Sequence, residues 1–205
     1  MSAAPPQGGL TQALGATSAV SLLEKTMNKL VVLAILAGLA PLQAAAEDLS
    51  KCMQGWDATE RGAYEQALAL YDSCVKTGDL SEASIARTYR NIGITLRRAN
   101  KPAEAVFAYD KAIALNPHDV ADDYINQGNA YDEAGEFQKA LDSYAKAIDI
   151  NPGHGEAYYN RGIAYERQSM LEQAKADFLA AYKHGLRTNA LYDRFVVHDL
   201  LDKVQ

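Results

Sequence analysis

The 205-residue chain lacks the residue patterns that usually carry catalysis. No serine stands in a nucleophile-elbow context, and no glycine-rich segment has the form of a phosphate-binding loop. The acidic pairs at 122–123 and 132–133 lack the spacing of a calcium-binding loop, so we expect each to lie on a solvated helix face. These absences predict a protein without enzyme activity of its own and without a cofactor.

Histidine and cysteine are scarce as well. None of the four histidines stands at metal-ligand spacing from another histidine or from a cysteine, so no metal site is expected. We expect all four in loops or on the solvated surface. They are His118, His154, His184 and His198.

The chain also has little basic charge and no apolar segment of membrane-spanning length. Lys and Arg number 20 against 26 Asp and Glu, a net charge of −6 that argues against a nucleic-acid partner. The apolar run from Leu30 to Ala40 is shorter than the roughly 20 residues that cross a bilayer. With Lys29 before it and three alanines ending at Ala46 after it, residues 27–46 form a predicted signal peptide.

We expect cleavage after Ala46, a periplasmic location and no stable membrane anchor afterwards. A short membrane anchor is the alternative reading of the same segment. Residues 1–26 are polar, small and without periodicity, which is unusual ahead of a signal peptide. We interpret them as an over-extended gene model with Met27 as the true start; a long unstructured leader is the alternative.

What the chain does have is an internal repeat. Gly93, Gly128 and Gly162 stand 35 and 34 residues apart, and each follows a tyrosine by four positions. An alanine comes twelve residues after each glycine, an aromatic residue four further on, and a second alanine three beyond that. Small residues let two helices approach closely, and the aromatic residues fill the seam between them. A period of this length predicts a solenoid of paired helices.

These marks resemble the tetratricopeptide repeat. Residues 121–154 match nearly the whole signature, with Ala134 to Phe137 as the turn and Leu96 and Leu186 as departures in the neighbouring units. The matching positions are Tyr124, Gly128, Tyr131, Gly135, Phe137, Ala140, Tyr144, Ala147 and Pro152. The resemblance implies an all-α fold, an α-α superhelix of helix-turn-helix units.

We divide the exported chain into four units and a cap. The units are a degenerate first repeat at 47–82 and repeats at 83–119, 121–154 and 155–187. Residues 188–205 are predicted to form a capping helix that shields the last seam with apolar side chains at helical spacing. These side chains are Leu191, Phe195, Val196 and Leu200.

The two cysteines both fall in the degenerate first unit. In the repeat register Cys52 lies near the start of the first helix and Cys74 near the end of the second, ends that antiparallel packing brings together. A disulfide is possible at that position and would suit an oxidising compartment. Two free buried thiols are the alternative.

The resemblance implies binding of a protein or peptide partner in a groove lined by the first helix of each unit. Carried over by position, the groove residues are Arg87, Arg90, Ile94, Arg97, Arg98, Ile125, Asn126, Asn129, Tyr159 and Ile163. The arginines suit an acidic peptide, and Ile125, Tyr159 and Ile163 offer apolar contact. Alternatively, the arginines pair with acidic residues of adjacent helices and keep the groove solvated.

One ligand class of this family is not expected. Members that bind chaperone tails use a two-carboxylate clamp, and here Arg90 and Asn126 match it whereas Ile94, Glu156 and Asn160 do not. We therefore predict a non-enzymatic adaptor or scaffold in the cell envelope. The alternatives are an accessory or regulatory subunit of a cell-wall enzyme, and a self-associating structural module that forms homo-oligomers.

Overall fold

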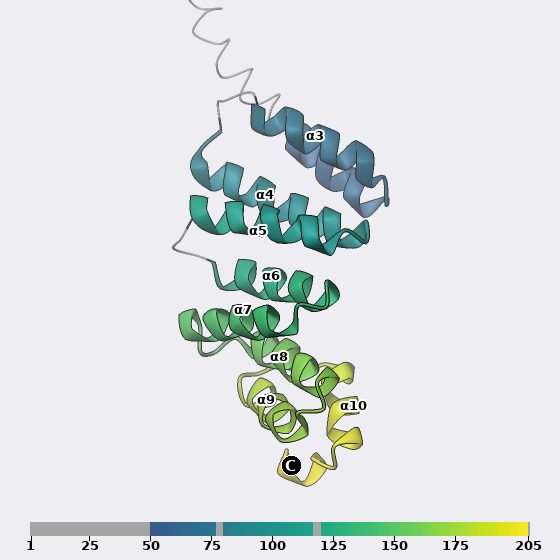
Figure 1. Cartoon of the computed structure of the whole chain (residues 1–205), viewed down its shortest axis with the longest axis vertical. Coiled ribbons are helices and arrows are strands. Elements are labelled where there is room, and N and C mark those ends of the chain that lie inside the picture. Colours follow the sequence, from purple (N-terminus) through teal and green to yellow (C-terminus); the bar gives the residue numbers. More distant parts are fainter. Residues whose placement is uncertain (1–49, 77–79, 117–119, 205) are drawn as a thin grey trace, which may run out of the picture. The chain divides into compact units, whose positions relative to one another are not determined.

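The computed structural model describes residues 50–76, 80–116 and 120–204, and all the secondary structure in these ranges is helical (Figure 1). The predicted leader at 1–26, the predicted signal peptide at 27–46 and His118 lie outside the described residues. Within them, no helix combines the length and apolar character needed to cross a membrane. The all-α prediction is confirmed.

The helices follow one another in pairs joined by short turns. Residues 50–60 form the first helix of the first pair, and α3 (Tyr64–Lys76) is its second. The next pairs are α4 (Glu82–Arg98) with α5 (Pro102–Leu115), α6 (Ala121–Glu133) with α7 (Phe137–Ile150), and α8 (Gly155–Arg167) with α9 (Leu171–Lys183). From α4 to α9 each helix packs most closely on its partner and then on the next pair.

The turn inside each pair has the same backbone form. One residue lies in the left-handed region, with φ of 75° at Gly62 and 78° at Gly135; Asn100 and Ser169 hold the equivalent places. The amide of the next residue donates to a carbonyl five residues earlier, as from Glu136 to Tyr131 at 2.8 Å. This is a helix C-terminal cap that turns the chain back on itself.

Each pair closes through contact between a glycine and an aromatic ring sixteen residues later. A Cβ built on any of these glycines would lie 2.5 to 2.7 Å from a ring carbon, well inside van der Waals contact. All four rings are buried. The glycine–aromatic contacts are Gly55–Tyr71, Gly93–Tyr109, Gly128–Tyr144 and Gly162–Phe178. They explain why the sequence repeats a glycine where alanine would be the better helix former.

The C-terminal cap departs from the prediction. Helix α10 (Asn189–Val197) buries Leu191 and Phe195 against the last pair, but it ends at Val197, and Leu201–Lys203 form a separate 3-10 turn. Val196 is 64% exposed, so its expected place in the last seam is wrong. Leu191 and Phe195 stand four residues apart and share a face, whereas Val196 is one position further around the helix.

Cys52 and Cys74 are joined by a disulfide, with their Cα atoms 5.5 Å apart. The bridge links the two helices of the first pair. Cys52 Sγ also lies 3.2 Å from the Thr88 hydroxyl of α4, and Cys74 is fully buried. The disulfide therefore fixes the helix at 50–60 on its partner, and Cys52 lies at the contact with the second pair.

The glycine–aromatic contacts can be tested by adding one methyl group. In Gly128→Ala the new Cβ would overlap the buried Tyr144 ring, so we expect the free energy of unfolding to fall by about 1–2 kcal/mol despite the better helix propensity of alanine. Gly153→Ala is the control, because a Cβ built on Gly153 would come no closer than 3.4 Å to a neighbouring atom. Equal unfolding free energies of the two variants in urea titrations would contradict the contact.

Candidate functional site

The surface formed by residues 50–60, α4, α6 and α8, here called the first-helix face, carries three adjoining pockets. The Trp56 pocket, of about 300 Å³, is lined by Cys52, Met53, Trp56, Asp57, Ser84, Arg87, Thr88 and Asn91. The Ile94 pocket is lined by Trp56, Ile94, Arg97, Arg98, Asn126 and Glu133. The Tyr159 pocket is lined by Arg97, Asn129, Asp132, Glu133, Tyr144, Tyr159, Asn160, Ile163 and Arg167. Shared lining residues make the three continuous.

Most of the groove residues predicted from the repeat register line these pockets. Arg87 lies in the Trp56 pocket; the others are Ile94, Arg97, Arg98, Asn126, Asn129, Tyr159 and Ile163. Ile125 does not: it is 3% exposed and packs in the core with Ala140 and Leu141, so it offers no apolar contact to a ligand. Arg90 lines none of the three pockets and is held by an acidic residue of the next pair.

The arginines of α4 engage acidic residues of neighbouring helix pairs. Arg90 donates two hydrogen bonds to the Asp123 carboxylate, of 2.5 and 2.8 Å. Arg97 makes a two-point contact with Glu133, and Arg98 donates to Glu60 at 2.6 Å. The sequence left open whether these groups face a ligand or pair across helices. Pairing across helices is what the structure shows for all three.

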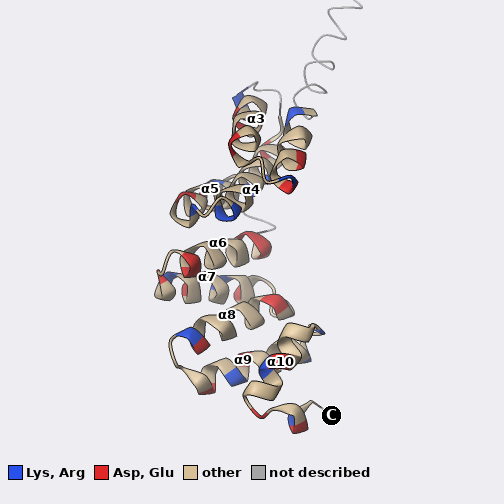
Figure 2. Ribbon diagram, turned by 90° about the vertical axis from the view of Figure 1, so that its right-hand side faces the viewer, with Lys and Arg blue, Asp and Glu red and all other residues tan. Residues whose placement is uncertain are grey.

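The same pattern continues along the stack with the charges reversed. Asp132 occupies in α6 the place that Arg97 occupies in α4, and it pairs with Arg167 of α8. Glu166 occupies that place in α8 and contacts Arg194 of α10 at 3.1 Å. Each helix pair is thus tied to the next by an ion pair, and basic and acidic residues are interspersed along the helices (Figure 2).

Burial and the partner's charge together shift the pKa values of these groups. Burial lowers the pKa of Arg97, but its hydrogen bonds to Glu133 and the charge of that carboxylate raise the pKa above its ordinary value. Burial raises the pKa of Asp132, and the Arg167 guanidinium opposes the shift. One oxygen of Asp132 is buried without a hydrogen-bond partner among the described residues. Burial also raises the pKa of the Tyr109 hydroxyl, to about 12, with Arg97 acting in the opposite direction.

Two expectations about charged surface residues are corrected. Of the acidic residues at 122–123 and 132–133, Asp122 is exposed as expected, but Asp123 is buried and the side chain of Asp132 is only 9% exposed. Asp123, Asp132 and Glu133 each receive an arginine from another helix pair. His198 is not a surface histidine: its side chain is 6% exposed and its Nε2 lies 3.0 Å from Glu166. Reasoning along one helix could not supply the residues that cover these side chains.

The other described histidines have different settings. His154 lies 2.9 Å from Asp122, and His184 stacks on Tyr158 with ring centroids 5.2 Å apart. Across 50–76, 80–116 and 120–204, no cluster of three or more His, Cys, Asp or Glu side chains is arranged to hold a metal ion.

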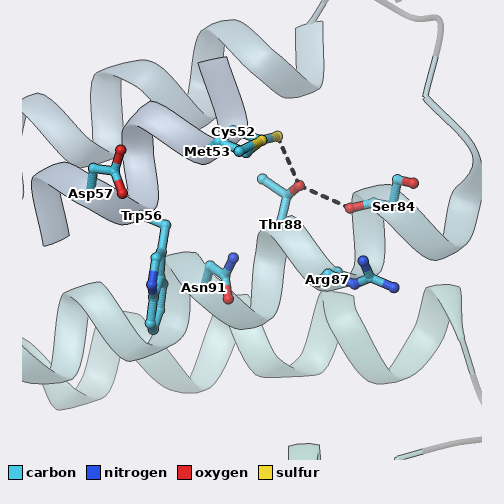
Figure 3. A pocket seen from close by; sticks show the side chains of 8 residues that line it. All are labelled: Cys52, Met53, Trp56, Asp57, Ser84, Arg87, Thr88 and Asn91. Atoms are coloured by element: carbon cyan, nitrogen blue, oxygen red, sulfur yellow. Dashed lines mark hydrogen bonds between the residues drawn. The ribbon is translucent and has the colours of Figure 1, made fainter. Parts of the chain in front are cut away.

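The Trp56 pocket contains the residues that the sequence analysis missed. Figure 3 shows Met53 and Trp56, from the helix at 50–60, facing Arg87 and Asn91 of α4. Trp56 follows Gly55 just as Ile94 follows Gly93, so carrying the groove positions back by one more unit would have found it. The degenerate signature of the first unit hid that correspondence.

The structural role of the arginines predicts unequal effects of two similar substitutions. Arg90→Gln leaves the carboxylate of Asp123, which is 1% exposed, without its counter-charge, so we expect a loss of about 2–4 kcal/mol in unfolding free energy. Arg98→Gln removes a half-exposed pair with Glu60 and should cost no more than about 1 kcal/mol. Denaturant unfolding of both variants measures the difference, and a larger loss for Arg98→Gln would refute the assignment.

Two segments match models of known repeats. Residues 86–119 match the tetratricopeptide repeat, and residues 128–169 match a model described as TPR repeat. These matches agree with the repeat resemblance. They cover α5, α7 and α8 in full and α4 and α6 in part.

Solved structures share the architecture. MamA is 28% identical, with a TM-score of 0.59 over 67% of this chain and 77% of its own. The TPR domain of Arabidopsis OM64 is 27% identical, with a TM-score of 0.52 over 60% of this chain and 98% of its own. YrrB, described as a TPR protein with an unusual peptide-binding site, is 20% identical, with a TM-score of 0.61 over 86% and 88%.

These similarities confirm the prediction of a helical solenoid. At 20% identity, the similarity to YrrB concerns the fold alone. A tetratricopeptide-repeat solenoid is a scaffold for protein–protein interaction.

Proposed function

We propose that the chain is a non-enzymatic adaptor that binds a segment of a partner protein along the first-helix face. The observation that carries this proposal is the continuity of the Trp56, Ile94 and Tyr159 pockets across the first helices of four successive pairs. An extended segment can place side chains in successive pockets while its backbone follows the face between them.

The polar groups of the face suit a peptide backbone. Asn126 and Asn160 line the pockets and have no side-chain hydrogen bond to another described residue. The side-chain oxygen of Asn129 (Oδ1) accepts a hydrogen bond from the Tyr144 hydroxyl at 2.7 Å, which orients the Asn129 amide group. An asparagine side chain presents both donors and an acceptor, the groups that a peptide N–H and C=O require.

The ion pairs between helix pairs support the same proposal by holding the face in place. Arg90, Arg97 and Arg167 each join a first helix to a neighbouring first helix. A surface held rigid before binding loses less conformational entropy when a ligand arrives. The arginines therefore contribute to binding through the shape of the face.

We also propose that the adaptor works in the periplasm, after cleavage of residues 27–46 as a signal peptide behind Ala46. The disulfide between Cys52 and Cys74 supports this location, because such bridges persist in oxidising compartments and are rare where thiols are kept reduced.

The binding face is tested by photo-crosslinking from two aromatic positions. A photoreactive benzoylphenylalanine at Tyr159, in a pocket, should yield adducts with a partner protein in the native envelope. The same residue at Phe107, which is 63% exposed and lines none of the three pockets, is the matched control and should yield few. Equal adducts from both positions, or adducts with a second copy of this chain only, would refute binding along this face.

Export is tested by the intact mass of the protein recovered from cells. We expect a chain that begins at Glu47 and lacks the thiol hydrogens of Cys52 and Cys74. The proposal fails if the recovered chain retains residues 27–46 or if it carries two alkylatable thiols before any reductant is added.

A further inference from the structure

We propose that the Trp56 pocket anchors a peptide segment in which a large apolar side chain stands next to an aspartate or glutamate. The inference rests on the proposed function and adds the class of ligand and the place where it is anchored. It comes from three properties of one pocket: an apolar wall made by Met53 and Trp56, an arginine without an ion pair to any described residue, and a polar floor.

The apolar part of the pocket comes from the helix at 50–60. Met53 is 70% exposed although it is large and apolar, and Trp56 beside it forms the wall shared with the Ile94 pocket. A volume of about 300 Å³ is at the lower end of ligand pockets and fits a single large side chain. Burying the methionine and the indole face against a Leu or Phe would remove apolar surface from water.

The charge of the ligand follows from Arg87. Arg90, Arg97 and Arg98 of the same helix all engage carboxylates, whereas Arg87 is exposed and has no ion pair with any described residue. A guanidinium group at the edge of an apolar pocket binds a carboxylate through two parallel hydrogen bonds. The acidic residue of the segment therefore lies at Arg87.

Asp57 gives the pocket a direction. Figure 3 shows Asp57 at one end and Arg87 at the other, with Trp56 and Asn91 between them. An acid on the Arg87 side of the apolar residue is attracted, and a second acid on the opposite side would be repelled by the Asp57 carboxylate. The pocket thus selects a segment with negative charge on one side of its apolar anchor.

The floor of the pocket is already fixed. The Thr88 hydroxyl donates to the Ser84 carbonyl oxygen at 2.9 Å and lies 3.2 Å from Cys52 Sγ (Figure 3). The disulfide joins Cys52 to Cys74 of α3, so the helix that supplies Met53 and Trp56 is fixed on that side. Asn91 lines the pocket, and its side-chain amide has no hydrogen bond to another described residue, so it is available to a peptide backbone.

The pocket carries its own reporter, because Trp56 is the only tryptophan in the chain. The probe is a peptide with blocked ends, acetyl-Gly-Ser-Leu-Asp-Gly-Ser-amide, titrated against the full mature protein while tryptophan emission is recorded. We expect a saturable change in emission. Replacing Leu by Ala or Asp by Asn in the probe should weaken binding by about tenfold each, the loss of one apolar anchor or one charge-assisted hydrogen bond.

A further probe distinguishes the carboxylate of an acidic side chain from the carboxylate of a chain terminus. It ends in a free Leu carboxyl group and contains no Asp. We expect weaker binding than for the blocked probe, since the segment should continue beyond the pocket. Binding of the free carboxyl probe alone would overturn the proposal in favour of a chain terminus.

Two protein variants locate the contact. Arg87→Gln should weaken binding of the blocked Leu-Asp probe by about tenfold and leave the circular dichroism unchanged, because Arg87 is exposed. Lys183→Gln, an exposed cation at the end of α9, is the matched control and should bind the probe as the unchanged protein does. Unchanged binding by Arg87→Gln, or no response of Trp56 to any probe, would overturn the proposal.

The result is separable from that of the proposed function. Adducts from Tyr159 together with a silent Trp56 pocket would refute this inference and leave the binding face standing. Absence of both would refute both.

Discussion

The contact between a glycine of the first helix and a buried aromatic ring of the second is the constraint on which the rest of the structure depends. At Gly128 there is no room for a methyl group above Tyr144, so the two helices lie closer than any other residue would allow. That approach fixes how each first helix is turned about its axis. The next residue in each pair, Trp56, Ile94, Asn129 or Ile163, consequently lies on the first-helix face.

The helix pairs could be predicted from the sequence because their determinants are local. Glycine, alanine and aromatic residues that meet inside one pair recur at a fixed spacing, and a single unit such as 121–154 contains all of them. The surface could be predicted only in part. The ionic partner of Arg97 is Glu133, which belongs to the next pair. His198 is buried by the packing of the cap. Such contacts depend on how the pairs stack, which no repeat signature specifies.

The arginines of α4 have two different settings, and the proposed binding mode gives each a different role. Arg90, Arg97 and Arg98 neutralise carboxylates of neighbouring helix pairs, so the middle of the face carries little net charge despite its many ionised groups. Arg87 lies beyond the last of these pairs, beside the exposed Met53 and the half-buried Trp56 of the disulfide-linked first pair. In the proposed binding surface, ion pairs therefore hold the middle, and Arg87, which has no ion pair with a described residue, marks the proposed anchor at one end.

Hydrogen exchange of the arginine Nε–H groups, followed by nuclear magnetic resonance, tests this division most directly. The Nε hydrogens of Arg90 and Arg97 are donated to Asp123 and Glu133, so the account predicts slow exchange for both. It predicts fast exchange for Arg87, which no described carboxylate contacts. Slow exchange at Arg87, or fast exchange at Arg90, would contradict the division between structural and ligand-facing arginines.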